Sequence, residues 1–158
     1  MGEWTKGIEI KAPIDFVWKY FDGSVKDMKK IMPQVVEHVE VKKTEEGTGS
    51  VYRQKYKEGK RVMEYDVETL NYEDGEDKKV LKVGFTLGSL FDITALYELI
   101  KIDDETTYFR YTTTNEPLKW YVRMFLLFAS DRSVSKFTQR VKFVAEEEYG
   151  DSKAEAGV

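Results

Sequence analysis

Large side chains with a polar tip recur at alternate positions in the middle of the chain. Tyr52, Gln54 and Tyr56 alternate along one segment, Tyr65 follows in the next, and Tyr97 lies further on. A tyrosine buries a large apolar ring but needs a partner for its hydroxyl. Several of them on one face of a sheet are typical of a pocket with a few polar points, which suits an amphipathic ligand. The alternative is a solid core in which each hydroxyl reaches solvent or backbone.

Asp131 is the one candidate for acid–base chemistry, because it falls within an apolar stripe at helical spacing between Trp120 and Val144. A carboxylate in an apolar cavity is costly unless it is paired, and its pKa would rise there. Such a group could orient a ligand or transfer a proton. The simpler interpretation places Asp131 on the flank of a helix, next to solvent or to Arg132 and Lys136. We therefore name no residue as catalytic on the sequence alone.

The other reactive side chains favour ordinary structural interpretations. His38 is the only histidine and lies in a charged segment, so we expect a surface residue. With one histidine and no cysteine, disulfides, thiolate catalysis and His-rich metal sites are excluded. Glu64, Asp66 and Glu68 alternate and could resemble a metal-ligand set, but their spacing fits the solvated outer face of a strand better. We expect no metal and no cofactor.

The composition excludes several classes of protein. Hydrophobic residues make up 41% and aromatic residues 14% of the 158 residues, which excludes wholesale disorder. The net charge is −4 and the two signs are interspersed, so the clustered basic surface that nucleic acid requires is missing. No apolar run is long enough to predict a membrane span, and the first residues lack the apolar core of a signal peptide. We expect a cytoplasmic protein with no nucleic-acid partner.

Periodicity predicts the elements that must position the tyrosines. Residues 4–10 alternate as a strand, and residues 14–21 and 25–32 have helical spacing, with Ser24 as the cap of the second helix. Six further strands are predicted at residues 35–43, 51–57, 63–68, 81–87, 91–102 and 106–114, with an acidic loop at 71–77. The period becomes helical from Pro117, and we expect that helix to end near Gly150, before a disordered tail at 151–158.

Strands joined by short turns pair as antiparallel neighbours, and a twisted sheet wraps around a helix on its concave face. The predicted fold is therefore α+β and forms a single domain over residues 1–150. It has a seven-stranded curved antiparallel sheet wrapped around a long C-terminal helix, with two short helices after the first strand.

This order of elements resembles the helix-grip fold of the SRPBCC superfamily, which includes START lipid-transfer domains, pollen-allergen-like proteins and polyketide cyclases. The residues that carry the resemblance are the segment APIDFVW at 12–18 with the strand before it, the turn GTGSV at 47–51, the paired strands around Glu58-Gly59, and the closing helix. The resemblance covers roughly residues 3–148.

The resemblance implies an apolar ligand, such as a lipid, sterol, quinone or polyketide, held between the sheet and the last helix. On the strands it implies pocket positions at Tyr52, Gln54, Tyr56, Met63, Tyr65, Phe85 and Tyr97. On the helix it implies Trp120, Met124, Leu127 and Phe128 as the residues that close the cavity.

Three functions remain open from the sequence. The first is binding or transport of a hydrophobic small molecule. The second is a cyclase- or aromatase-like enzyme, for which Asp131, Gln54 and the tyrosines are the available groups; a buried Asp131 would favour it and an exposed one would disfavour it. The third is a protein-interaction module, because residues 120–128 are apolar nearly all round. That segment could form a homodimer contact or touch a membrane transiently.

Overall fold

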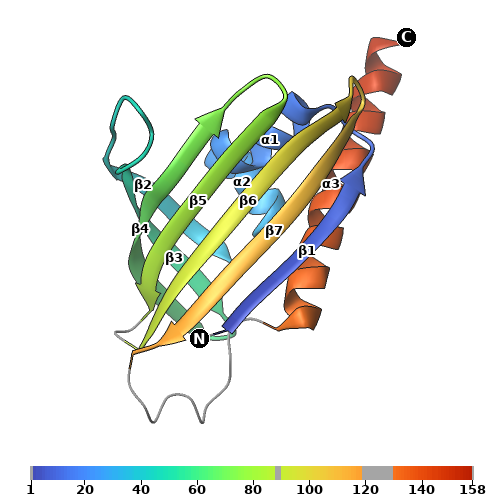
Figure 1. Ribbon diagram of the computed structural model, residues 1–158. Coiled ribbons are helices and arrows are strands. Elements are labelled where there is room, and N and C mark those ends of the chain that lie inside the picture. Colours follow the sequence, from blue (N-terminus) through green and yellow to red (C-terminus); the bar gives the residue numbers. More distant parts are fainter. Residues whose placement is uncertain (1, 88–89, 119–129, 158) are drawn as a thin grey trace.

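The computed structural model describes residues 2–87, 90–118 and 130–157 (Figure 1). Over these residues the elements follow in the order β1 (Gly2–Ile10), α1 (Ile14–Asp22), α2 (Val25–Ile31), β2 (Val35–Lys42), β3 (Val51–Glu58), β4 (Arg61–Asp74), β5 (Lys78–Leu87), β6 (Phe91–Asp103), β7 (Thr106–Pro117) and α3 (Asp131–Ala156).

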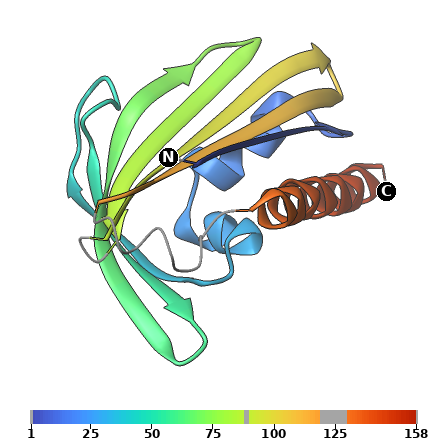
Figure 2. The same ribbon diagram turned by 60° about the horizontal axis from the view of Figure 1, so that its bottom comes forward.

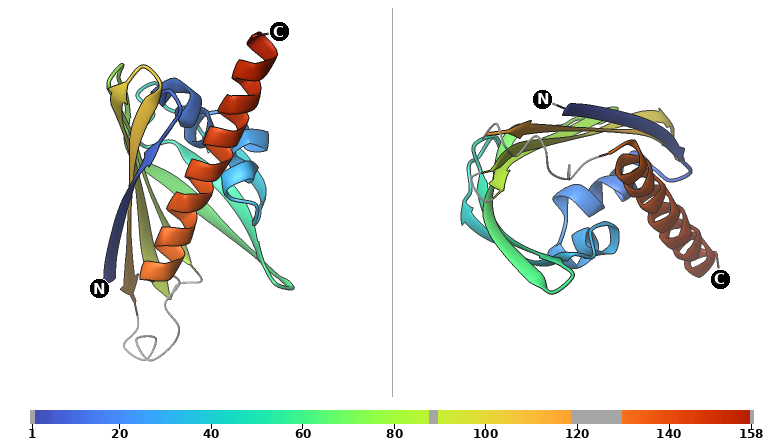
Figure 3. Two further views of the ribbon diagram at one scale, coloured as in Figure 1. Left: turned by 90° about the vertical axis from the view of Figure 1, so that its right-hand side faces the viewer. Right: turned by 90° about the horizontal axis from the view of Figure 1, so that it is seen from below.

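The strands form one antiparallel sheet in the order β1-β7-β6-β5-β4-β3-β2. Figure 2 and the right-hand view of Figure 3 show the sheet curving around the two short helices, with α3 along the side of β1. Over the described residues, the predicted helix-grip fold is confirmed in its strand number, its pairing and its three helices. The charged strand β2 forms a free edge of the sheet, as its composition predicts.

The solid part of the core lies where α1 and α3 meet the long strands β6 and β7. Phe21 of α1 packs against Tyr97 and Phe109, with ring centroids 4.9 and 5.4 Å apart. Val141 of α3 and Leu99 of β6 are fully buried in the same cluster. Each fully buried side chain of this size contributes about 1.5–3 kcal/mol, so this cluster fixes the helices against one half of the sheet. The other half curves away from it.

Several strands are longer than the sequence predicts, and the extensions of β4 and β7 replace an expected loop and the expected start of a helix. β4 continues to Asp74 through most of the expected acidic loop, because an irregularity between Thr69 and Asn71 shifts the pairing by one residue and breaks the alternation. β7 continues to Pro117, which pairs with Phe91. The helix predicted from Pro117 is therefore wrong at its start, and residues 119–129 lie outside the described part of the chain.

The bounds of α3 also differ from the prediction. It begins at Asp131, after a capping box in which Ser130 and Ser133 accept hydrogen bonds from each other's backbone N–H groups. It runs through Gly150 to Ala156, into the expected tail. A glycine inside a helix, such as Gly150, costs about 1 kcal/mol. Glu105 offsets this cost because it contacts α3 on both sides of Gly150. The Glu105 carboxylate accepts a hydrogen bond from the Tyr149 hydroxyl at 3.0 Å and pairs with Lys153 at 3.1 Å.

Candidate ligand-binding cavities

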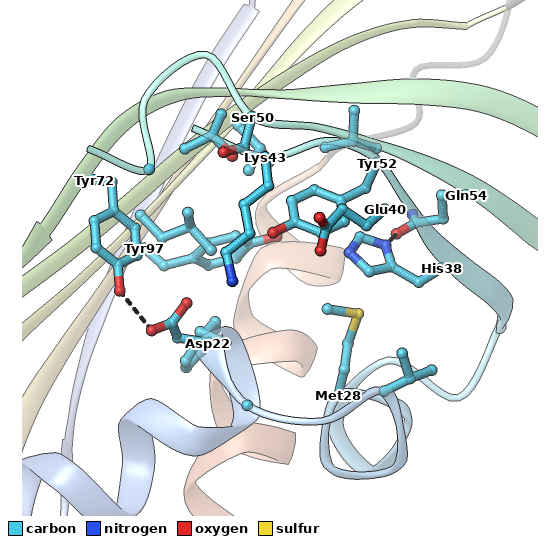
Figure 4. A pocket seen from close by; sticks show the side chains of 18 of the residues that line it. Asp22, Met28, His38, Glu40, Lys43, Ser50, Tyr52, Gln54, Tyr72 and Tyr97 are labelled. Carbon is cyan, nitrogen blue, oxygen red and sulfur yellow. Dashed lines mark hydrogen bonds between the residues drawn. The ribbon is translucent and has the colours of Figure 1, made fainter. Parts of the chain in front are cut away.

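The concave face of the sheet encloses two adjoining cavities. The first cavity, of about 620 Å³, lies between the end of α1, α2 and the inner faces of β2 to β6 (Figure 4). Its apolar wall is formed by Phe21, Met28, Val67, Leu81 and Val83. Strands β2 to β5 curve away from α3 here (Figure 3), and the first cavity lies on their concave face.

The second cavity, of about 410 Å³, lies between the inner faces of β3 to β7 and the first turns of α3. Met63, Ile93 and Tyr111 line it from the sheet, while Val134 and Phe137 line it from the helix. Both volumes fall in the range of about 300–1,000 Å³ that is usual for small-molecule pockets.

Four residues line both cavities and separate them: Met32, Gln54, Phe85 and Tyr97. A methionine adapts its shape readily, and rotamer changes of exposed or cavity-facing side chains are fast. The two cavities adjoin along this partition of four side chains.

All seven strand positions implied by the resemblance line these cavities. Tyr52 lines the first cavity; Tyr56, Met63 and Tyr65 line the second; Gln54, Phe85 and Tyr97 line both. Whether these side chains contact a ligand stays a prediction. The four helix positions, Trp120, Met124, Leu127 and Phe128, lie outside the described residues. So does the 120–128 segment expected to contact a membrane or a second copy.

Asp131 is not where acid–base chemistry in the cavity would require it. Its side chain is 80% exposed, lies 3.8 Å from the Lys6 ammonium and lines neither cavity. Because Ser130 is the N-cap of α3, Asp131 occupies the first helical position, where the helix dipole stabilises a carboxylate. The apolar stripe predicted around Asp131 therefore combines residues that precede α3 with residues inside it.

His38 is the residue that the sequence analysis assigned wrongly. It pairs directly with Gln54 across the β2–β3 ladder, so both side chains lie on the concave face and His38 lines the first cavity. The valines that follow it in β2, Val39 and Val41, point outward and are 48% and 52% exposed. The hydrophobic pattern of this edge strand is thus inverted, with the polar side chains facing the cavity.

A chain of hydrogen bonds runs across the partition between the cavities. The Nδ1 atom of His38 lies 2.9 Å from Gln54 Oε1, and the Gln54 amide nitrogen donates to the Tyr65 hydroxyl at 2.9 Å. The imidazole also stacks on Tyr52, with ring centroids 4.7 Å apart and an interplanar angle of 13°. Burial lowers the pKa of His38, and the Gln54 hydrogen bond offsets only part of this. Burial raises the pKa of Tyr65 to about 12. Both groups are therefore uncharged at neutral pH.

Polar side chains surround the first cavity at its mouth. The Tyr72 hydroxyl donates to Asp22 Oδ2 at 2.6 Å, which joins β4 to the end of α1 (Figure 4). Burial and the neighbouring Asp22 carboxylate raise the pKa of Tyr72. Glu40 and Lys43 line the same opening and are exposed to solvent. Gly47 has a φ of +86°, and a Cβ there would lie 2.7 Å from the Tyr72 ring, so only glycine lets the loop approach this closely.

Asn115 is a polar residue of the second cavity that the sequence did not suggest. It is 1% exposed, and neither atom of its side-chain amide has a hydrogen-bond partner among the described residues. A buried amide without partners costs about 1–3 kcal/mol. Asn115 lies in a strand rich in Thr and Tyr, which indicates a strand but gives no sign that this position faces a cavity.

The described residues contain no cluster that could hold a metal ion. Nowhere in residues 2–87, 90–118 and 130–157 do three Asp, Glu or His side chains gather as a metal site. Glu64 and Asp66 instead pair with Arg53, at 3.7 and 3.1 Å, on the exposed face of the sheet. No helix in the described part of the chain is long and apolar enough to cross a membrane.

Comparison with known proteins supports the fold. No protein-family model matches the chain, and no curated protein sequence matches it either. Among solved structures, it is similar to norcoclaurine synthase from Thalictrum flavum in complex with dopamine and hydroxybenzaldehyde, with a TM-score of 0.64 at 14% identity over 92% of this chain and 87% of that one.

Two further solved structures agree with this. Major latex-like protein 151 from Panax ginseng matches with a TM-score of 0.64 at 18% identity, over 93% of this chain and 96% of that one. The Zhui aromatase/cyclase from Streptomyces sp. R1128 matches with a TM-score of 0.66 at 12% identity, over 94% and 95%. The chain therefore has the helix-grip fold that these solved structures share.

Proposed function

We propose that this chain binds a hydrophobic small molecule in the two adjoining cavities between the curved sheet and α3. The observation that carries the proposal is the pair of cavities of about 620 and 410 Å³, lined by the same aromatic face of the sheet and separated only by four side chains. Protein interiors are close-packed and contain few voids larger than a water molecule, so cavities of this volume favour a ligand-binding function.

Burial of the ligand would supply most of the affinity. Removing about 200 Å² of apolar ligand surface from water contributes about 5 kcal/mol at the usual coefficient of about 25 cal/mol per Å². Gln54, the inner tyrosines and Asn115 would then set the orientation. Among the described residues the Asn115 amide has no hydrogen-bond partner, which favours a ligand whose polar group can form hydrogen bonds with it.

The structural neighbours support an aromatic or polycyclic ligand for this chain. One neighbour is described in complex with dopamine and hydroxybenzaldehyde, and another is an aromatase/cyclase. The shared fold hosts several functions, so the function of this chain depends on the residues of its own cavities. Asp131, the acid–base candidate of the enzyme alternative, is exposed and lines neither cavity, which disfavours that alternative, and binding is the function that the site supports best.

A cavity-filling variant tests the proposal. N-phenyl-1-naphthylamine is an apolar probe whose fluorescence rises on transfer from water to an apolar site. Val83→Trp places a large ring in the first cavity, while Val62→Trp adds the same ring on the outer face, where Val62 is 55% exposed. We expect the parent chain and Val62→Trp to bind the probe equally and Val83→Trp to bind it about tenfold more weakly, which is the effect of about 1.4 kcal/mol. Equal binding by all three, with unchanged circular dichroism, would overturn the proposal.

Native mass spectrometry of the freshly purified protein, followed by organic extraction, would then identify the class of ligand. A stoichiometric mass adduct that the Val83→Trp variant lacks is the expected result.

A further inference from the structure

The ring nitrogen Nε2 of His38 is free on the cavity side. Nδ1 is occupied by Gln54 Oε1 at 2.9 Å, whereas no described residue forms a hydrogen bond with Nε2. Figure 4 shows this second nitrogen directed into the first cavity. The ring is held in that position from its face as well, by the stack on Tyr52.

The Gln54 oxygen that lies beside Nδ1 indicates which nitrogen of the neutral His38 ring carries the proton in this arrangement. A primary amide has its donor and its acceptor on different atoms. The Gln54 nitrogen donates to the Tyr65 hydroxyl, so the Gln54 oxygen is the atom that faces His38. An oxygen can only accept, so Nδ1 bears the hydrogen and Nε2 of the neutral ring bears the lone pair.

We propose that His38 Nε2 is the acceptor for a hydroxyl group on the ligand, and that the ligand is a planar aromatic molecule with a phenolic or enolic hydroxyl. This rests on the proposed function, because it names the chemistry of a ligand in the first cavity. In the hydrogen-bonded chain His38–Gln54–Tyr65, the Nε2 atom of His38 is a hydrogen-bond acceptor. It favours a ligand group that donates a hydrogen bond and disfavours a carbonyl or a carboxylate, whose lone pairs would face that of Nε2.

The surroundings of His38 favour a flat aromatic body next to this hydroxyl. The rings of Tyr52, Phe85 and Tyr97 line the same cavity, and aromatic pairs in offset or edge contact gain about 0.5–1.5 kcal/mol beyond their area burial. Glu40 also lines the cavity from the same strand as His38, so a carboxylate ligand near Nε2 would meet a second negative charge. A neutral phenol avoids both costs.

The tautomer can be measured directly, because His38 is the only histidine in the chain. Nitrogen-15 NMR of the imidazole therefore needs no assignment. At pH 7.5 we expect one protonated nitrogen, correlated as Nδ1, and one unprotonated Nε2. Addition of 2-naphthol should move the Nε2 resonance upfield, as a hydrogen bond to the lone pair does, and 2-methylnaphthalene should leave it in place. A protonated Nε2, or no difference between the two probes, would overturn the proposal.

A double-mutant cycle gives the energetic test. His38→Phe keeps a flat ring on Tyr52 but removes both nitrogens. We expect it to weaken 2-naphthol about fivefold to tenfold, the effect of one net hydrogen bond, and to change 2-methylnaphthalene by less than about twofold. Equal effects on both probes would show that His38 contributes shape alone.

Tyr65→Phe is the second variant and leaves His38 in place. Without the Tyr65 hydroxyl the Gln54 amide can rotate, so we expect both imidazole tautomers in the NMR spectrum and a smaller loss of 2-naphthol affinity. A single unchanged tautomer would contradict the proposed chain.

The outcomes separate this inference from the proposed function. If the parent chain binds both probes but His38→Phe weakens the binding of both equally, the cavity binds ligands and the proposed hydrogen bond between His38 and a ligand hydroxyl is wrong. If the parent chain binds neither probe, the proposed function and the inference fail together.

Discussion

Tyr20 on α1 and Glu148 on α3 are joined by a hydrogen bond from the tyrosine hydroxyl to the carboxylate, across 128 positions of sequence. The same carboxylate accepts a hydrogen bond from the Lys30 ammonium of α2 at 2.8 Å. One side chain therefore links the three helices that stand opposite the sheet. Because α1 and α2 bound the first cavity and α3 bounds the second, this link holds the walls of both cavities in place.

Replacement of Glu148 by glutamine should weaken that link without changing its shape. The ion pair with Lys30 is lost, while an amide oxygen can still accept from Tyr20. We expect a loss of about 1–2 kcal/mol in the free energy of unfolding, measured by urea denaturation. Glu147→Gln is the matched control: its exposed carboxylate has no ion-pair partner among the described residues, and we expect a change within about 0.5 kcal/mol. Equal losses in the two variants would show that the link contributes nothing.

Stability should fall in acid because of the carboxylates of α3. Burial would raise the pKa of Glu146, but the hydrogen bonds from Lys142 and from the Lys11 backbone outweigh it and lower the pKa. The pKa of Glu148 is lowered in the same way by Lys30 and Tyr20, against burial. A carboxyl group whose pKa is lower in the folded state contributes stability above its unfolded pKa, near 4.5, and loses it as pH falls further.

The melting temperature should therefore drop between about pH 5 and pH 3, where these two carboxylates are protonated. In a Glu146→Gln/Glu148→Gln double variant the same drop should be shallower, although the variant is less stable at pH 7. Parallel melting curves for the parent and the double variant over this range would contradict the assignment.

The beginning of α3 is fixed by the capping box. Ser133 N donates to Ser130 Oγ at 3.2 Å, and Ser130 N donates to Ser133 Oγ at 2.9 Å. Ser130→Ala removes the first of these, and we expect it to cost about 1 kcal/mol. Because the cap holds the first turn of α3, its loss should also speed amide hydrogen exchange in that turn. Ser133 and Val134 of this turn line the second cavity. Ser135→Ala, one turn inside the helix, should cause neither change; a comparable effect there would argue against the cap.

The sequence predicts most of the sheet because alternation is a local property. The concave face of β3 to β6 could be identified residue by residue, and Tyr52, Tyr65 and Tyr97 line the cavities as the resemblance implies. The pairing of β2 could not. An eight-residue connection separates it from β3, from residue 43 to 50, and such a connection does not fix the register. The charged segment around His38 led to the expectation of a surface residue, whereas Val39 and Val41 face outward and His38 lines the first cavity.

The start of the last helix was predicted wrongly for a different reason. Apolar residues before and after Asp131 share a helical spacing, so two segments were joined into one helix. The signal that separates them is local: Ser130 and Ser133 have the spacing of a capping box, which marks the start of a helix. Asn115, in contrast, carries no local signal. Its burial depends on how far β7 extends toward Pro117 and on the position of α3, neither of which follows from composition.

Methyl NMR with N-phenyl-1-naphthylamine tests the central claim most directly, because the chain carries valines on both faces of the sheet. Val67 and Val83 line the first cavity, whereas Val39, Val41 and Val62 are exposed on the outside. Titration of the probe into protein with labelled valine methyl groups should shift the Val67 and Val83 resonances saturably and leave the three outer valines unchanged. Shifts confined to the outer valines, or none at any probe concentration, would contradict a ligand cavity between the sheet and α3.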